Sequence, residues 1–367
     1  MTTISIRRDH HATTVHRFPA EWEPQSGIML TWPHSHGDWA PVLDEADATF
    51  ATIACAVARH EPVLITAYDE DHRARVLATL RKADTDMARI QVFLAPSNDV
   101  FVRDHGPLTV EAEGGALLQD FTFNGWGRKY AYGADDALTR TLHAQGAFGV
   151  TRLEATDFVL EGGSVESDGA GTLLVTASCL LSPARNPKKN ATEIEEILKE
   201  RLGARRVLWL HHGYLAGDDT DGHIDTLARF CDADTIAYCA CPWPDDEHYP
   251  ELKAMEEELR ALSTATGKPY RLVALPWPAA KLDATGERMP ATYANFLIIN
   301  GAVLVPTYND RQDAEALRVI GDRFPGREII GIPSLTLIAQ HGSLHCATMQ
   351  LPQGVLSETF TAAQEAP

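Results

Sequence analysis

The strongest constraint on the fold is a unit of secondary structure that recurs five times along the chain. In each copy a strand or hairpin is followed by an amphipathic helix and then by an apolar strand that runs into a polar loop. The fifth copy has the clearest hairpin signal, because Asn300-Gly301 separates two apolar runs. In the third copy, Thr192 and Glu195 form a candidate capping box at the helix start, and Gly203 is expected to end that helix.

The five copies differ in quality but keep the same order. The second has the poorest helix, and an additional helix and strand, 71–82 and 90–94, extend the first. The predicted segments are 27–32, 50–57 and 62–68; 108–110 with 116–123, 137–144 and 150–153; 172–176, 194–202 and 207–210; 223–231 with 235–241, 252–262 and 270–275; and 296–299 with 302–305, 317–324 and 328–332.

None of these units can bury its apolar face alone, so the sequence favours a closed ring of five ββαβ modules over two independent domains. No linker-like change of composition divides the chain. We therefore predict a single α/β domain over residues 1–367, with an ordered core of about 17–352. The polar tail after Pro352 is expected to fray.

Composition excludes several classes of protein. The 367 residues include 32 Lys and Arg against 51 Asp and Glu, a formal net charge of −19. This balance disfavours nucleic acid and anionic membranes as partners and suits a small cationic substrate. Six cysteines are too few for a disulfide scaffold and lack zinc-site spacing, and no apolar run has the length of a signal peptide or a membrane span. We expect a cytoplasmic protein with reduced thiols.

Chemically capable residues gather at equivalent places in the units, shortly after each closing strand. In a ring of repeats these positions converge on one axis, so their side chains are expected to surround a common cavity. A cysteine with a histidine is typical of nucleophilic catalysis, because the thiolate is the nucleophile. Neighbouring carboxylates would raise the pKa of that thiol unless the substrate brings a positive charge, and a guanidinium offers five donors to carboxylates. The pattern predicts a cysteine hydrolase that acts on a guanidine. The segments concerned are 98–107, 157–164, 217–225 and 341–346.

Strand spacing gives a further expectation for this site. His223 and Asp225 are two residues apart, which places them on the same face of a strand. Cys346 lies in a strand-like stretch, where a lone cysteine is more often a buried apolar residue. Cys239 and Cys241 alternate along an apolar strand and are expected to pack without a chemical role.

Six motifs, in the same order, resemble agmatine deiminase and its bacterial peptidylarginine-deiminase-like relatives, and the likeness covers nearly the whole chain. The resemblance implies the pentein fold, a five-bladed α/β propeller of ββαβ repeats around a central active site, in agreement with the repeat count. The motifs are Pro19-Ala-Glu-Trp-Glu-Pro-Gln, Asn98-Asp-x-Phe-x-Arg-Asp-x-Gly-Pro, Leu160-Glu-Gly-Gly-Ser, Gly217-Asp-Asp-Thr-Asp-Gly-His-Ile-Asp, Tyr293-Ala-Asn-Phe and Leu344-His-Cys-Ala-Thr.

The resemblance also implies the roles of individual residues. Cys346 is the nucleophile, His223 is the general acid and base, and Asp104, Glu161 and Asp225 contact the guanidinium. The implied reaction is hydrolysis of agmatine to N-carbamoylputrescine and ammonia, a step of putrescine and polyamine biosynthesis, through a covalent intermediate. It needs no metal and no organic cofactor. The implied partner is the small guanidine substrate, and the sequence leaves a homodimer open.

Two departures from the family pattern bear on the substrate. Agmatine deiminases usually carry Trp where this chain has Phe101, and Gly-Gly-Gly-Asn-Ile-His-Cys where it has Gln340-His-Gly-Ser-Leu-His-Cys. Free arginine, a methylarginine or a peptidyl-arginine are therefore alternative substrates, and transfer of the amidine to an amine is an alternative reaction. The arginine-like substrates carry a carboxylate, so a basic contact at the pocket mouth would distinguish them, with Arg103, Arg128 and Lys129 as candidates.

Several neighbouring residues allow a functional and a structural interpretation. Asp218 is a candidate substrate contact, whereas Asp219, like the third aspartate of that loop, is expected to form a turn. Asn295 is a candidate for a hydrogen bond in the site. The loops around Trp126 and Trp32 either close over the substrate as lids or simply pack. A metal-dependent hydrolase built on the aspartates of 218–225, or a guanidine-binding protein without turnover, is the alternative from another class.

Overall fold

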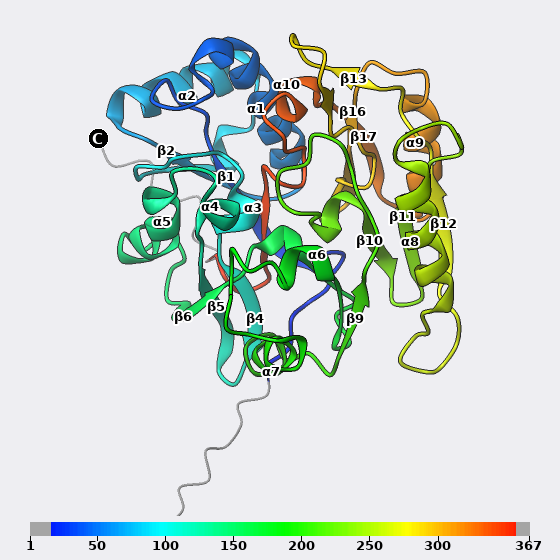
Figure 1. The fold of residues 1–367 in the computed structure, drawn as a ribbon. Helices are drawn as coiled ribbons and strands as arrows, with labels where there is room; N and C mark the ends of the chain where they lie inside the picture. Colours follow the sequence, from blue (N-terminus) through cyan, green and yellow to red (C-terminus); the bar gives the residue numbers. More distant parts are fainter. Residues whose placement is uncertain (1–15, 357–367) are drawn as a thin grey trace, which may run out of the picture.

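The computed structural model describes residues 16–356 and shows a mixed α/β fold (Figure 1). The predicted frayed tail lies outside the described residues from 357 onward, whereas Val355 and Leu356 are buried. The strands of the described chain form five sheets of three or four strands and one two-stranded hairpin. In each of the five sheets an antiparallel pair is extended by a parallel strand, and a helix fills the crossover.

Four of these sheets use strands that are consecutive in the sequence, as the repeat pattern predicted. They are β4 (Leu108–Ala112), β5 (Gly115–Thr122) and β6 (Arg152–Val159) with α5 (Gly133–Ala144); β7 (Val165–Ser167), β8 (Thr172–Thr176) and β9 (Arg206–Leu210) with α7 (Ala191–Leu202); β10 (Ala228–Asp232), β11 (Thr235–Cys239) and β12 (Arg271–Leu275) with α8 (Tyr249–Ala261); and β15 (Leu297–Ile299), β16 (Ala302–Thr307) and β17 (Glu328–Pro333) with α9 (Asp313–Gly321).

The remaining large sheet brings together strands from both ends of the described chain. Its order is β18-β1-β2-β3, and the last strand pairs antiparallel with the first. The sequence predicted the additional helix and strand of this sheet, but not the partner that the C-terminal strand provides. Its elements are β1 (Gln25–Thr31), α1 (Leu43–Ala58), β2 (Val63–Ala67), α2 (Glu70–Lys82), β3 (Ile90–Leu94) and β18 (Met349–Pro352).

The longer helices lie toward the outside of the molecule, while α3 and α6 lie nearer its middle (Figure 1). The outer helices bury one side, as α7 does with Ile194, Leu198 and Leu202 at a spacing of four residues. No helix within residues 16–356 has the length and hydropathy needed to cross a membrane. The short elements are α3 (Val102–His105), α4 (Gly125–Arg128), α6 (Ala177–Leu180), α10 (Leu335–Ile338), β13 (Lys281–Leu282) and β14 (Arg288–Met289), with single turns of 3₁₀-helix at Ala40–Val42, Met87–Arg89, Gly162–Ser164 and Ile224–Thr226.

The start of α7 differs from the predicted one. Asn190 caps this helix and forms the capping box with Glu193, because each side chain accepts a hydrogen bond from the other residue's backbone N–H, at 3.1 and 2.9 Å. The prediction of Thr192 and Glu195 placed the same motif two residues too late. The predicted end is confirmed, since Gly203 adopts the left-handed conformation with φ 69°.

Two strand predictions near the candidate site were wrong. His223 and Asp225 do not share a strand face, because the chain forms a 3₁₀ turn at Ile224–Thr226 and β10 begins only at Ala228. Cys346 lies in the turn before β18 and not in a strand. In both segments polar side chains are held by irregular backbone, for which strand periodicity gives no signal.

Candidate active site

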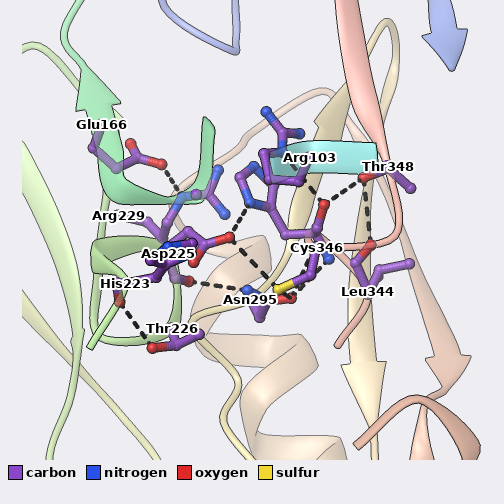
Figure 2. A network of polar contacts seen from close by, with 12 residues as sticks. Arg103, Glu166, His223, Asp225, Thr226, Arg229, Asn295, Leu344, Cys346 and Thr348 are labelled. Carbon is purple, nitrogen blue, oxygen red and sulfur yellow. Dashed lines mark hydrogen bonds and ion pairs between the residues drawn. The ribbon is translucent and has the colours of Figure 1, made fainter. Parts of the chain in front are cut away.

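Cys346 is held in place by contacts from two distant segments. Its carbonyl oxygen accepts a hydrogen bond from Arg103 N–H at 3.1 Å, and its own N–H donates to Asn295 Oδ1 at 3.2 Å. The same amide oxygen lies 3.5 Å from the sulfur. In Figure 2 the side chains of Asn295 and Asp225 both point toward this sulfur. Cys346 is almost fully buried, with protein atoms on most sides of its thiol.

Two buried carboxylates flank the thiol. Asp225 Oδ2 lies 3.8 Å from Cys346 Sγ, and Asp225 Oδ1 has no hydrogen-bond partner within residues 16–356. Asp104 accepts hydrogen bonds from the Trp126 indole N–H and from Gly163 N–H, both at 2.9 Å. An unpaired buried carboxylate oxygen is costly unless it serves a ligand, so the free oxygen of Asp225 marks a place for a donor.

His223 lies beside Asp104 with Nδ1 3.5 Å from Oδ1. Neither ring nitrogen has a hydrogen-bond partner in the described chain, and burial lowers the pKa of this imidazole to about 3. Gly163 makes the close approach possible, because a Cβ there would lie 2.7 Å from the ring and 2.8 Å from the Asp104 oxygen. His223 is therefore neutral at physiological pH and can accept a proton.

The carboxylates control the charge state of the thiol. Burial raises the pKa of Cys346 well above its usual range, and the negative charges of Asp225 and Asp104 raise it further. Burial and the charge of Asp225 likewise raise the pKa of Asp104. A cationic group bound between these residues would lower the pKa of both Cys346 and Asp104 and favour the thiolate.

Glu161 contacts an arginine of the chain itself. Arg185 Nε lies 2.8 and 3.0 Å from the two carboxylate oxygens, and its other nitrogens donate to Asp221 Oδ2 at 2.5 Å and to Thr220 O at 2.8 Å. Arg185 and Glu161 are fully buried at their side chains. No motif marked Arg185 in the sequence, because a single arginine in a polar segment has no periodic signal.

A second buried network lies next to Asp225. His345 Nδ1 lies 2.7 Å from Asp225 Oδ2, and its Nε2 lies 2.7 Å from Glu21 Oε2, both within hydrogen-bond distance. Arg229 Nη2 lies 2.9 Å from the same Glu21 oxygen, and Arg229 Nε forms an ion pair with Glu166 (Figure 2). Every charged group of this network thus faces an opposite charge.

Two groups of described residues bring three metal-ligand side chains within 4.8 Å of one another. Each group already has its carboxylates paired with a buried arginine, Arg185 in one and Arg229 in the other. A metal ion would have to displace a guanidinium, so both groups are organised as ion-pair networks. They are Glu161, Cys179 and His223, and Glu21, Glu166 and His345.

A narrow cavity, partly open to solvent, leads to the thiol. Four aspartates line it, and no lysine or arginine belongs to its lining within the described chain. Phe101 packs so closely over Gly342 that a Cβ at the glycine would lie 2.2 Å from the ring. The lining residues are Asp38, Asp99, Phe101, Asp104, Trp126, Tyr130, Asp219, Thr220, Gln340, His341, Gly342 and Cys346.

The structure places the predicted substrate contacts differently. Phe101 and Asp104 line the cavity, whereas Asn295 lies behind the thiol and supports it. Asp218 is absent from the lining, because its oxygens accept hydrogen bonds from the hydroxyl of Thr220 and the N–H of Gly222 within its own loop. Asp219, expected to form a turn, lines the cavity instead.

The Trp126 loop covers one side of this cavity. Trp126 has a positive φ of 52° and donates its indole N–H to Asp104. The loop is joined to the opposite wall by Tyr130, whose hydroxyl donates to Asp219 Oδ2 at 2.6 Å. Trp32 is fully buried against Asp47 and lines no part of the cavity, so that loop packs.

The three candidate basic contacts are not at the cavity. Arg103 is buried behind the thiol and donates to the His345 carbonyl at 3.3 Å and to Gln350. Lys129 reaches outward to Asp221 Oδ1 at 2.8 Å, and Arg128 is not among the lining residues. The cavity wall thus offers carboxylates, and no fixed cation, to whatever binds there.

Comparison with known proteins gives the family of this chain. Residues 17–352 match the family model for Porphyromonas-type peptidyl-arginine deiminase. The chain belongs to this family. The match covers nearly the whole described structure, including the segments that carry the site above.

Individual relatives show which named proteins this chain resembles. The agmatine deiminase of Stutzerimonas stutzeri is 34% identical over 357 residues, which cover 91% of this chain and 95% of that protein. A structure from Porphyromonas gingivalis, provisionally named an arginine deiminase, is 52% identical with a TM-score of 0.88 and covers 93% of this chain and 100% of that one. A Cys-to-Ser variant of the C. jejuni agmatine deiminase, solved with its substrate bound, is 34% identical with a TM-score of 0.86, at 97% and 100% coverage.

Proposed function

We propose that this protein is a cysteine-dependent deiminase that hydrolyses agmatine to N-carbamoylputrescine and ammonia. The observation that carries the proposal is a cavity that ends at Cys346 and is lined by four aspartates without any lysine or arginine among its described lining residues. Curated relatives and solved structures named agmatine deiminase, at about a third identity over most of the chain, support the same reaction.

The charge of the cavity favours a substrate with two positive ends. Asp104 and Asp225 would bind the guanidinium beside the thiol, since guanidinium and carboxylate pair in a planar, bidentate way. Asp38, Asp99 and Asp219 line the rest of the cavity, where agmatine would place its ammonium group. Free arginine would bring a carboxylate to the same aspartates, and like charges in a narrow cavity repel.

The first half of the reaction uses the neutral histidine and the thiol. Binding of the guanidinium lowers the pKa of Cys346, and the thiol proton passes to His223. The Cys346 sulfur then attacks the guanidinium carbon. His223 returns the proton to one amino nitrogen, the carbon–nitrogen bond breaks, and ammonia leaves. A positively charged S-alkylthiouronium remains on Cys346.

The second half replaces the sulfur by oxygen. A water molecule gives one proton to His223 and attacks the thiouronium carbon. The carbon–sulfur bond breaks as the carbonyl of the ureido product forms. Of the two protons of that water, one restores the thiol and the other is released to solvent, where it converts the ammonia of the first half to ammonium, so the atoms and charges balance without a redox partner.

We assign Glu161 to the support of His223, because Arg185 already engages both of its oxygens and an oxygen of Glu161 lies within 4.8 Å of a His223 ring nitrogen. Asn295 is assigned to the orientation of Cys346 through its contacts with the backbone and the sulfur. Asp218 shapes the loop that carries Asp219, which replaces it as the substrate contact in this proposal.

We further propose that the five sheets close into one ring, a single five-bladed pentein domain. The pairing of β18 with β1 supports this arrangement, because it joins the two ends of the described chain in one sheet. All six cysteines are free, as in a reducing compartment, which supports a cytoplasmic location.

Deimination of free arginine is the second candidate, and the P. gingivalis relative with that provisional name favours it. The two are separated by measuring ureido product and ammonia from agmatine, arginine, a methylarginine and a C-terminal-arginine peptide with metal-free enzyme. We expect kcat/KM to be at least about tenfold higher for agmatine than for the other substrates, which is the size of effect expected from one charge contact. Turnover of arginine with silence on agmatine would overturn the substrate and keep the cysteine chemistry.

A variant at the cavity mouth tests the recognition of the ammonium group. Asp38 is exposed there, and Asp38→Asn should raise KM for agmatine about two- to fivefold while leaving KM for butylguanidine, which has no ammonium, unchanged. Asp245→Asn, at an exposed aspartate outside the cavity lining, is the matched control. An equal effect on both substrates would contradict the assignment.

A further inference from the structure

His345 stands next to Cys346 in the sequence and is bound on both ring nitrogens. Nδ1 lies 2.7 Å from Asp225 Oδ2, and Nε2 lies 2.7 Å from Glu21 Oε2. Its backbone N–H donates to Asn295 Oδ1 at 2.8 Å, the atom that also receives Cys346 N–H. His345 is 2% exposed, so little solvent competes for these contacts.

The two carboxylates fix the protonation of this ring. An ionised carboxylate can only accept hydrogen bonds, so each ring nitrogen must carry a proton if both partners are ionised. Glu21 also faces Arg229 at 2.9 Å and Arg103 at 3.8 Å, and these cations, with His345, hold its pKa below the usual range although burial opposes them. Burial would also raise the pKa of Asp225, but the hydrogen bond from His345 lowers it below its usual range.

The two carboxylate oxygens of Asp225 have different surroundings. His345 holds Oδ2, the oxygen that lies 3.8 Å from Cys346 Sγ. Oδ1 is buried and has no partner among residues 16–356. A hydrogen bond to one carboxylate oxygen restricts rotation of the group, so the unpaired second oxygen is held in one direction.

We propose that His345 is a positioning residue: as an imidazolium bridging Glu21 and Asp225, it holds Asp225 ionised and oriented so that Oδ1 receives an N–H of the guanidinium. The role rests on the proposed function, because it concerns a guanidine bound at Cys346. The imidazolium also balances one negative charge next to Asp104, which allows two carboxylates to share a buried site.

Binding to an inactive background tests this role. In the Cys346→Ser protein, His345→Gln should weaken agmatine binding about 10- to 100-fold, because the supporting hydrogen bond and charge are lost. In Cys346→Ser with Asp225→Asn, adding His345→Gln should change affinity less than about twofold, since the residue acts through Asp225. His60→Gln, at a histidine paired with one carboxylate and outside the cavity lining, is the control and should leave affinity unchanged.

Three results would overturn the proposal in this experiment. They are unchanged affinity in His345→Gln, an equal loss with and without Asp225, and the absence of agmatine binding to the Cys346→Ser protein itself. For the last result, wild-type turnover of agmatine is measured in parallel. If the wild type does not turn over agmatine, the proposed function is refuted as well; if it does, only the proposal for His345 is overturned.

A second measurement needs no variant to fold and no substrate. The ¹⁵N signals of His345 in the resting wild-type protein should show a proton on both ring nitrogens at pH 7. A single protonated nitrogen would contradict the imidazolium, whatever the enzyme does with agmatine. The signals are assigned by their absence from the His345→Gln spectrum or, if that variant does not fold, by selective labelling of the His345–Cys346 pair.

Discussion

The buried polar groups on the two sides of Cys346 differ in whether they have partners. On the cavity side, both nitrogens of His223 and one oxygen of Asp225 are buried without a partner in the described chain. Both residues lie next to Asp104, which lines the cavity, and neither belongs to the lining itself. On the far side, His345, Glu21 and Arg229 pair with opposite charges at 2.7 to 2.9 Å. Unpaired buried groups destabilise a fold, while a fully paired network holds its members in one geometry.

This difference separates what binds from what positions. The cavity side keeps its polar atoms for a guanidinium and for a proton in transit, and the far side fixes the residues that carry them. Changes on the cavity side should therefore affect rate with little effect on stability. Changes on the far side should reduce stability as well as activity.

The largest expected effect is at the nucleophile. Cys346→Ser should lower kcat by on the order of 10⁴-fold or more and leave the melting temperature nearly unchanged, because a serine hydroxyl does not form the anion that attacks. Cys55→Ser, at a half-buried cysteine outside this cavity, is the control and should keep full activity. Near-native turnover by the Cys346 variant would exclude the cysteine mechanism.

Loss of the proton carrier should come next. His223→Gln should slow both formation and hydrolysis of the covalent intermediate, by on the order of 10³-fold each, because both steps move a proton through this ring. Rapid-quench kinetics with mass spectrometry resolves the two steps. If only one step slows, a second group carries the other proton.

A change on the far side should have a mainly structural effect. Glu21→Gln leaves Arg229 and His345 with one buried anion fewer and should cost about 3 kcal/mol of unfolding free energy. Because the folded pKa of Glu21 is lowered, its contribution is present above its unfolded pKa and is lost as pH falls. Denaturation by urea at pH 7 and pH 4 measures this.

The contrast for Glu21 is an exposed pair. Glu328→Gln removes the partner of Arg59 at the surface and should destabilise the protein far less than Glu21→Gln at either pH, because solvent screens an exposed ion pair. A loss as large as that of Glu21→Gln would show that burial does not set the difference between the two pairs.

The smallest effect concerns Glu61, a buried carboxylate that accepts a hydrogen bond from the backbone N–H of Asn300. Burial raises its pKa to about 7, so its stabilising contribution is present below its unfolded pKa and is lost as pH rises through 7. Glu61→Gln should therefore melt a few degrees above the wild type at pH 8 and close to it at pH 5. A higher melting temperature of the wild type at pH 8 would contradict the raised pKa.

Local periodicity predicted most of the elements, because helix and strand faces repeat within a few residues. The segment 172–176 is β8, and Asn300-Gly301 forms the expected hairpin with Gly301 at φ 73°. The pairing of β18 with β1 has no local signal, since the strands lie at opposite ends of the chain. The segment of His223 and Asp225 also differed from the predicted strand, because the 3₁₀ turn that it forms does not follow the two-residue period of a strand.

The sequence identified side chains of the site but not their partners. Asp104 and Asp225 both lie beside the Cys346 thiol, as expected if equivalent positions of the repeats converge, and their roles stay predictions. The guanidinium of Arg185 on Glu161 and the bridge through His345 were missed. The partners of a buried charge depend on tertiary geometry, which residue types at a given spacing do not encode.

Detection of the covalent intermediate tests the central mechanism most directly. Wild-type protein mixed with agmatine, quenched in acid within milliseconds and weighed intact, should gain the mass of agmatine minus ammonia, and peptide mapping should place the gain on Cys346. Release of ammonia with no such adduct, or an adduct on another residue, would contradict the assignment of Cys346 as the nucleophile.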